Sequence, residues 1–446
     1  MIRLKLKNRF CSTLRSEAAP ELIVLANPAT VALEPSRIPF VKPRLLVREQ
    51  DRVSIGTPLY TDKRNPALRF LSPGAGAVES IRFGKRRVIQ EIIIRLDPEE
   101  TRETFLSMER NLIASAQPET LIQRLVDGGL WQLMEQLPFR DYPDPKQSIP
   151  MIIVSLRPGD MFSPLPETIL TGREDLFLAG IDILGRLTKS LVVAAPAASI
   201  PNLNAISHTL THVTDDTFPA GDPAVILYQV RTAPDQNRAC HVGLQDLLAM
   251  ADLVLNGTFP TTRIITRTGS RSPKPVHLKS RAGSPLQDLA GSGEPGRDLL
   301  THGIFNGHRP PGDAHLGFRE TSVILLDGPL PDALFGFARL GLHALTESRT
   351  FASSLVPGKR DMDTGLHGEV RACINCGLCD KKCPVDLLPQ FILKTVLAEE
   401  MEEALSLGLL DCAECGLCTF VCPSKIEVSS VLQQAKHALY KERTKP

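Results

Sequence analysis

Two cysteine runs near the end of the chain decide the fold of this region: Cys373-Ile-Asn-Cys-Gly-Leu-Cys-Asp-Lys-Lys-Cys-Pro384 and Cys412-Ala-Glu-Cys-Gly-Leu-Cys-Thr-Phe-Val-Cys-Pro423. Together they contain eight of the ten cysteines, and both have the pattern Cys-x2-Cys-x2-Cys-x3-Cys-Pro. Two residues between successive cysteines let one loop turn three thiolates toward a single [4Fe–4S] cluster, whose fourth ligand comes from elsewhere. The runs therefore predict two [4Fe–4S] clusters.

The same spacing occurs in bacterial ferredoxins, in which the fourth cysteine of each run binds the cluster of the other run. If the chain follows this crossover, the ligands of one cluster are Cys373, Cys376, Cys379 and Cys422. The ligands of the other cluster are then Cys412, Cys415, Cys418 and Cys383. These eight cysteines are the candidate cofactor-binding and metal-binding residues, and the sequence suggests no catalytic residue.

A pair of structural zinc sites is the alternative to two clusters. Zinc sites usually have two Cys-x2-Cys pairs that lie far apart in the sequence. Three closely spaced cysteines followed by Cys-Pro favour iron–sulfur clusters instead. A docking scaffold whose cysteines hold zinc, or no metal, is therefore the least favoured hypothesis.

Composition limits the class of protein and its partners. A chain of 446 residues is expected to divide into two to four domains. Its 51 Lys and Arg residues balance 50 Asp and Glu residues, so nothing indicates a nucleic-acid partner. Cysteines arranged for metal binding indicate a reducing compartment. The first ten residues lack the apolar core of a signal peptide, and no run of 18 apolar residues occurs, so we expect membrane association only through partner subunits.

The pattern of apolar residues divides the chain into four regions, which predicts an α/β multidomain protein. Short alternating strands fill residues 1–100, and helices alternate with strongly apolar strands in 101–257, which indicates a parallel sheet. Strand signals return in 258–328, and residues 329–446 are expected to be mostly helical around the cysteines. The predicted helices are 118–126, 179–187, 283–289 and 389–410, and the main predicted strands are 44–49, 88–95, 149–155, 191–195, 261–266, 275–278 and 321–326.

The order of these regions resembles the NqrA family, whose members are subunits of Na⁺-translocating NADH:quinone reductases, over nearly the whole chain. The resemblance implies a barrel-sandwich hybrid (1–100), a Rossmann-like domain (101–257), a β-grasp module of the SLBB type (258–328) and a helical domain with the two clusters (329–446). The stretches that carry the resemblance are Val47-Arg-Glu49, Asp62-Lys63, Gly76-Ala-Val78, Gly129-Leu-Trp131, Pro219-Ala-Gly221, Leu366-His-Gly368, Leu387-Leu-Pro389 and Leu417-Cys-Thr-Phe-Val-Cys-Pro423.

The resemblance implies an electron-transfer subunit that is not active alone. Its partners would be the other subunits of a membrane complex of the Nqr or Rnf type, at the cytoplasmic face of the inner membrane. The complex would oxidise NADH on another subunit, reduce ubiquinone or menaquinone and move sodium ions outward. No residue of this chain specifies a quinone site.

The chain departs from the NqrA pattern by keeping all eight cysteines, as does RnfC of the related Rnf complex. RnfC also has a glycine-rich loop for flavin and NADH, which should fall near residue 128. Here the chain reads Asp127-Gly-Gly-Leu-Trp-Gln132, so we expect neither FMN nor NADH on this subunit. An RnfC-like electron-entry subunit that binds both is the alternative hypothesis.

Isolated residues outside the cysteine runs indicate ordinary structural roles. Trp131 is expected to be a packing anchor, and Cys240, like Cys11, a small apolar side chain. Lys63 stands in a lipoyl-like Thr-Asp-Lys sequence but is expected to be a plain surface lysine. His208 and His212 are spaced like ligands on a helix, yet no third ligand accompanies them.

Overall fold

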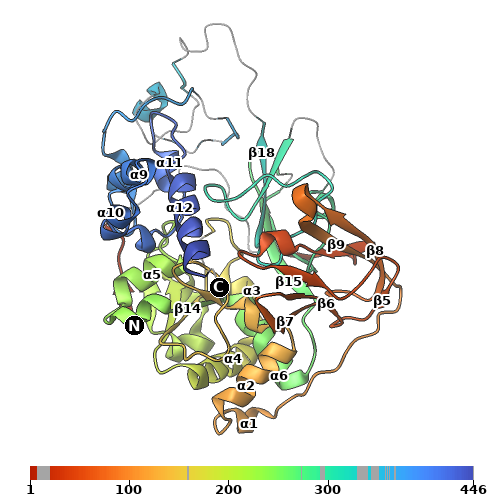
Figure 1. Cartoon of the computed structure of the whole chain (residues 1–446). Coiled ribbons are helices and arrows are strands. Elements are labelled where there is room, and N and C mark those ends of the chain that lie inside the picture. Colours follow the sequence, from red (N-terminus) through yellow and green to blue (C-terminus); the bar gives the residue numbers. More distant parts are fainter. Residues whose placement is uncertain are drawn as a thin grey trace.

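The computed structural model describes residues 1–7, 21–157, 160–272, 274–291, 297–328, 340–342, 351–356, 358, 360, 362–365 and 368–444. Four β-sheets and a helical C-terminal region make up this part of the chain (Figure 1). Cys11, Leu366 and His367 lie outside the described residues, as does much of the segment 329–372 that the sequence predicts to be helical.

Two small antiparallel sheets in the N-terminal region enclose one core. One sheet has the strand order β3-β9-β8-β5 and the other the order β4-β6-β7. Buried side chains from both, among them Val31, Leu59 and Ile92, fill the space between them. The rings of Tyr60 and Phe70 stack in this core with their centroids 4.5 Å apart. The strands are β3 Thr30–Leu33, β4 Pro43–Leu45, β5 Arg52–Val53, β6 Pro58–Asp62, β7 Asn65–Leu71, β8 Gly76–Phe83 and β9 Ile89–Leu96.

The β6–β7 hairpin ties this barrel to the rest of the chain. Lys63 is exposed at its turn. The neighbouring Arg64 binds Asp62 at 2.8 Å and Asp141, beyond the barrel, at 2.6 Å. Tyr440, near the end of the chain, also donates a hydrogen bond to Asp141. Three distant segments therefore meet at one carboxylate.

The central sheet has the order β1-β13-β12-β11-β14-β10, in which β10 runs antiparallel to β14 and the other pairs are parallel. Ile152 and Val154 of β11 pack in the core beneath α2, α4 and α6, whereas Ile153 packs on the opposite face with α5. Burial on both faces explains why these strands are continuous apolar runs. The strands are β1 Ile2–Leu4, β10 Glu135–Gln136, β11 Ile152–Ser155, β12 Leu191–Pro196, β13 His212–Thr214 and β14 Cys240–Gly243; the helices are α1 Arg110–Ile113, α2 Pro118–Asp127, α3 Pro166–Leu170, α4 Glu174–Leu187, α5 Pro223–Val230 and α6 Leu244–Asn256.

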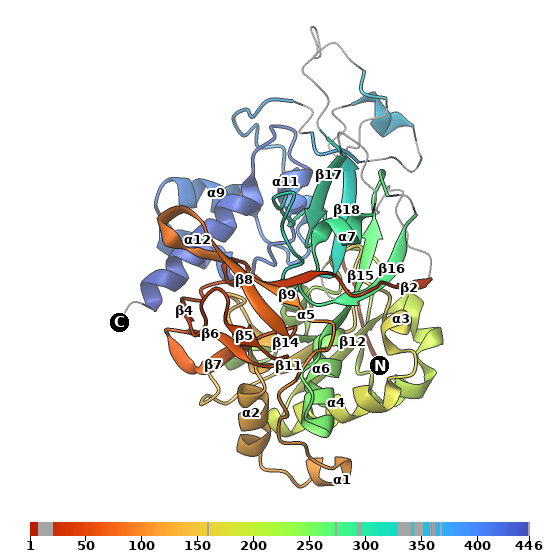
Figure 2. The same ribbon diagram turned by 90° about the vertical axis from the view of Figure 1, so that its right-hand side faces the viewer.

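A five-stranded mixed sheet of order β17-β18-β15-β16-β2 forms the third region, with helix α7 packed on it. Ile265, Leu278 and Val323 form its core together with Leu286 and Leu289 of α7. In Figure 2 this sheet lies to the right of the C-terminal helices and above the barrel. Its elements are β2 Leu22–Val24, β15 Thr262–Thr268, β16 Val276–Arg281, α7 Leu286–Ala290, β17 Arg297–Thr301 and β18 Ser322–Asp327.

The C-terminal helices pack against the central domain on the side of α5 (Figure 1). Val225 of α5 shares a core with Ile392 of α9 and Leu432 of α12. No helix of the described residues is long and apolar enough to cross a membrane. The helices are α8 Leu378–Lys382, α9 Pro389–Leu397, α10 Met401–Ser406, α11 Leu417–Phe420 and α12 Val428–Arg443.

Two N-terminal strands do not join the barrel, although the sequence division places residues 1–100 in it. Strand β1 pairs with β13 of the central sheet, and β2 pairs with β16 of the third sheet. Three-residue strands carry too few side chains to indicate which sheet they join, so their sheets could not be assigned from sequence.

The predicted helix 389–410 is wrong at its centre. Helix α9 ends at Leu397, and α10 starts only at Met401. Between them, Glu399 has a φ of +62°, a left-handed conformation that ends a right-handed helix. Because no Gly or Pro marks this break, the helical pattern of apolar residues continues across it in the sequence.

Buried acids lie where the barrel meets the third sheet. Glu91 of β9 accepts a hydrogen bond from the His315 backbone at 3.1 Å, and the His315 ring lies 3.3 Å from the same oxygen. Glu34, which follows β3, is 4% exposed and binds Arg37 at 3.2 Å. Burial, the charge of Glu320 and a hydrogen bond with Glu91 raise the pKa of Glu34 to about 8.

The first prediction concerns Gly283, whose carbonyl accepts a hydrogen bond from the Ala32 backbone at 2.9 Å. A Cβ on Gly283 would lie 2.1 Å from the Ala32 carbonyl oxygen, and its φ is +75°. Gly172 has a similar φ of +71° with no atom near a Cβ. Gly172→Ala should therefore show only the backbone cost of about 1–2 kcal/mol. Gly283→Ala should lower the thermal unfolding midpoint by clearly more. Equal midpoints for the two variants would contradict this close contact.

The second prediction follows from Glu34. Because its folded-state pKa is raised, its contribution to stability is complete below the unfolded pKa near 4.5 and is lost as the pH rises through about 8. Wild-type protein should lose stability relative to Glu34→Gln between these pH values, as measured by thermal unfolding. The exposed Glu79→Gln serves as control and should leave the pH profile of the wild type unchanged.

Candidate functional site

Each cysteine run folds as a loop followed by a short helix. Helix α8 begins after Gly377, with a φ of +69°, and α11 begins after Gly416, with a φ of +80°. The third cysteine of each run, Cys379 or Cys418, lies in the short helix. Left-handed residues recur at equivalent places in the two runs, namely Asn375 and Glu414, Gly377 and Gly416, and Asp386 and Lys425. The sequence repeat is therefore also a repeat of backbone conformation.

The first group of thiols combines three cysteines of the first run with one of the second. Gln390 and Leu393 of α9 close the same cavity, and Gln390 donates a hydrogen bond of 2.8 Å to Asp380. The cysteines that line this cavity are Cys373, Cys376, Cys379 and Cys422. Four thiols around one cavity fit the soft donor set of a [4Fe–4S] cluster.

The second group combines Cys383 with the three leading cysteines of the second run. Burial raises the pKa of Cys418, and the charges of Cys412, Cys415 and Cys383 raise it further. Burial is also the largest cause that raises the pKa of Cys415, and the charges of Cys412 and Cys383 again add to it. Cys383, Cys412 and Cys418 also pack in one cluster of apolar side chains, which agrees with a single group of thiols. Metal coordination would reverse the shift, because a coordinating thiol is deprotonated outright.

The two groups differ in exposure. Cys373 and Cys376 are exposed, whereas Cys383 and Cys415 are buried. Ile374, between the two exposed cysteines, has 68% of its surface exposed. The first group therefore lies nearer the protein surface than the second, although Cys412 and Cys418 of the second group are partly exposed.

Buried charges attach the second run to α12 and to the central domain. Lys436 of α12 is 1% exposed; its ammonium donates a hydrogen bond of 2.9 Å to the Cys412 carbonyl and lies 2.5 Å from the Glu414 carboxylate. From the central domain, Arg140 donates to the Ala413 carbonyl at 3.1 Å and to Asp222 at 2.8 Å. The loop between Cys412 and Cys415 is therefore held by two cations.

The second run also contacts the third sheet region. The ring of Phe420 in α11 lies 4.7 Å from that of Phe305, which in turn lies 5.5 Å from the ring of Phe218. A Cβ on Gly416 would lie 2.3 Å from the Phe305 carbonyl oxygen. Glycine at this position thus permits both the left-handed turn and the close approach of another chain segment.

Other candidate residues have structural roles. Trp131 is completely buried and donates a hydrogen bond of 2.7 Å to the Pro143 carbonyl, which confirms the predicted packing anchor. Cys240 is buried in β14. His208 lies in a 3₁₀ helix and His212 in β13, so they do not share a helix. Within the described ranges, no three His, Cys, Asp or Glu residues are grouped so that they could hold a single metal ion.

The third prediction concerns Lys436. Lys436→Met should leave the Glu414 carboxylate buried without its nearest cation, at a cost of about 3–5 kcal/mol. Hydrogen exchange should therefore speed up in α12 and in the loop 412–415 but not in α4. Adding Glu414→Gln should restore most of the protection, because the uncompensated charge is then gone. The exposed Lys441→Met is the matched control. Equal hydrogen exchange in the single and double variants would contradict a destabilisation by the uncompensated charge of Glu414.

Comparisons with known proteins agree with this architecture. The NqrA N-terminal barrel-sandwich hybrid domain matches residues 6–97, the NqrA second alpha/beta domain matches 116–259, and a 4Fe-4S dicluster domain matches 372–427. The NqrA protein of the Na⁺-translocating NADH-quinone reductase of Pseudomonas aeruginosa is 30% identical over 375 residues, which cover 83% of this chain and 84% of that protein. The Vibrio campbellii protein is 30% identical with the same coverage, and that of Saccharophagus degradans is 29% identical, also with 83% and 84% coverage. The chain belongs to the NqrA family of Na⁺-translocating NADH-quinone reductase subunits.

Proposed function

We propose that this chain is the electron-transfer subunit of a membrane complex that oxidises NADH, reduces a quinone and moves sodium ions. Its relatives are the NqrA subunits of Na⁺-translocating NADH-quinone reductases. Residues 372–427 match a 4Fe-4S dicluster domain, and iron–sulfur clusters carry electrons. The observation that carries the proposal is the exchange of the fourth cysteine, since Cys422 lies with the thiols of the first run and Cys383 with those of the second. By this proposal the chain is not active alone.

Two [4Fe–4S] clusters are the proposed cofactors, with the two groups of thiols as their ligands. Each bound cluster supplies one-electron transfer at a potential set by nearby charge, hydrogen bonds and burial. The first ligand set is Cys373, Cys376, Cys379 and Cys422. The second ligand set is Cys412, Cys415, Cys418 and Cys383.

The chain's own residues hold the two groups side by side. Helices α8 and α11 pack against each other, and each carries the third cysteine of its run. Cys379 is among the groups whose charge raises the pKa of Cys418, so these two thiols are near neighbours. Adjacent ligand sets give an electron a short path from one site to the other.

The two groups of thiols differ in exposure, which indicates the end of the electron path that a partner subunit can reach. The loop with Cys373 and Cys376 is open to contact, so it is the proposed place where a partner subunit exchanges electrons. The second group contacts α12, the central domain and the region of Phe305, and it is less exposed than the first. Lys436 and Arg140 lie beside it, but each is paired with a carboxylate, Glu414 or Asp222, so they hold the loop in place without adding net charge.

The remaining parts of the proposal follow from the family resemblance. The third sheet would be an SLBB-like β-grasp module in a division at residues 1–100, 101–257, 258–328 and 329–446. The chain would sit at the cytoplasmic face of the inner membrane and reach the membrane through partner subunits of the complex. Ubiquinone or menaquinone would be the acceptor at the level of the complex, and no quinone residues are assigned to this chain.

An RnfC-like electron-entry subunit with FMN and NADH remains the alternative, and the turn after α2 disfavours it. A Cβ on Gly128 would lie 2.1 Å from the Leu253 side chain, and one on Gly129 would lie 2.5 Å from that of Leu71. These glycines serve the packing of α2 against α6 and the barrel. Flavin absorbance in the purified protein would favour the alternative.

The fourth prediction tests the ligand sets. Cys376→Ser and Cys415→Ser should each lower the iron and acid-labile sulfide content from about eight atoms to about four per chain. Each should also remove one signal from the electron paramagnetic resonance spectrum of anaerobically reduced protein, and stop electron flow through the complex. The N-terminal barrel should stay folded in both variants.

Cys240→Ala is the matched control, because Cys240 is buried in the central sheet away from both groups. It should keep the full iron content and both signals. Purified protein with zinc, or with neither iron nor sulfide, would instead support a docking scaffold. Unchanged turnover in both Cys→Ser variants would mean that electrons bypass this chain.

A further inference from the structure

A cavity of about 360 Å³ lies where the barrel, the central domain and the third sheet meet. Its walls come from β3 and β7 of the barrel, from α4 and α6 of the central domain, and from β15 and β16. Cavities of about 300–1,000 Å³ are typical of small-molecule sites, and such sites prefer domain junctions. None of the eight cysteines lines this cavity.

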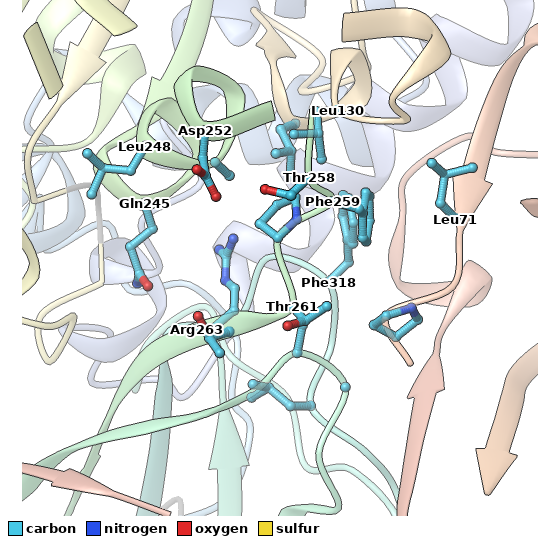
Figure 3. A pocket seen from close by; sticks show the side chains of 18 of the residues that line it. Leu71, Leu130, Gln245, Leu248, Asp252, Thr258, Phe259, Thr261, Arg263 and Phe318 are labelled. Atoms are coloured by element: carbon cyan, nitrogen blue, oxygen red, sulfur yellow. The ribbon is translucent and has the colours of Figure 1, made fainter. Parts of the chain in front are cut away.

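Much of the cavity lining is apolar. Leu71 approaches from the barrel, Leu130 and Leu248 from the central domain, and Phe259 and Phe318 from the segments that flank the third sheet (Figure 3). These side chains form an apolar surface. Transfer of an apolar ligand group from water onto this surface would be favourable.

The charged groups of the lining are mostly cations. They are Arg102, Arg173, Arg263 and Lys279, against the single carboxylate of Asp252. Arg263 is paired, because it lies 2.6 Å from Asp246, which does not line the cavity. Figure 3 shows Arg263 among Gln245, Leu248 and Asp252 on one side and the two phenylalanines on the other. The lining therefore has an excess of positive charge.

Arg173 is the cation most available to a ligand. It precedes α4 and is half-buried. Among the residues that the structure describes, its guanidinium has no hydrogen-bond or ion-pair partner. Burial lowers the pKa of Arg173, and the charge of Asp252 opposes this. Arg173 is not among the side chains with a fully buried, unpartnered polar atom, so its guanidinium is accessible, and an anionic ligand would give it charge-assisted hydrogen bonds.

We propose that this cavity binds an amphipathic anion, a carboxylate or phosphate monoester with an apolar chain or ring. The anionic group would pair with Arg173, whose planar fork suits both kinds of oxyanion. The apolar body would lie against Leu248, Phe259 and Phe318. The inference stands independently of the clusters and of the proposed electron-transfer function.

The test is isothermal titration of the full-length, cluster-loaded protein with decanoate, decyl phosphate, decanol and acetate. Decanoate or decyl phosphate should bind at one site, at least about tenfold more tightly than decanol, because the charged hydrogen bonds add to the apolar contacts. Acetate should bind more weakly than either amphipathic anion. The tighter of the two anions identifies the headgroup as a carboxylate or a phosphate.

Arg173→Gln should weaken binding of that anion by about 10-fold to 100-fold and leave decanol unchanged. Arg48→Gln removes one exposed charge outside the lining and should have no effect. Ala249→Phe, which fills the cavity, should abolish binding of both anion and alcohol. Trp131, between Leu130 and Leu133 of the lining, gives a second readout through its fluorescence. Equal affinity for decanoate, decyl phosphate and decanol, or anion binding that survives both variants, would overturn the proposal.

Discussion

The exchange of one cysteine between the two runs is the constraint on which the C-terminal region depends. Cys422 lies at the cavity of the first run, and Cys383 lies with the thiols of the second. Neither loop can complete its group of four alone, so both must fold together. The repeated left-handed residues and the packing of α8 against α11 serve this mutual arrangement. The two repeated cysteine runs thus form one structural unit.

Charged contacts then fix this unit to the rest of the chain. Lys436 and Arg140 donate to the backbone carbonyls of Cys412 and Ala413, and Arg231 binds Asp411 at 2.5 Å. Near the end of α12, Tyr440 and Arg64 share Asp141. Buried ion pairs add little net stability, since desolvation offsets their attraction. Their specific geometry instead selects one docked position over others that an apolar surface would also allow, which suits a region whose thiols must stay in place.

The sequence predicted well those features that local patterns determine. The strands 149–155 and 191–195 and the helix 118–126 were predicted within a few residues, because burial on defined faces leaves a clear apolar pattern. The cysteine spacing also predicts the two ligand sets, and that assignment stays a prediction. Features set by distant contacts were missed: β1 and β2 join sheets far along the chain, and the Lys436–Glu414 pair has no signal beyond two ordinary charged residues. Only tertiary packing decides these.

At the junction of the three N-terminal regions, close approach at glycines is added to charged contacts such as that of Arg281 with Glu100 at 2.7 Å. Gly283 meets Ala32, and Gly129 meets Leu71. Such contacts hold the barrel, the central domain and the third sheet close together, but they do not fill the space where all three meet. The cavity beside Leu130 and Phe318 is what remains. Glycine contacts at this junction leave no room for larger side chains there, and the guanidinium of Arg173, which has no partner among the described residues, lines the cavity.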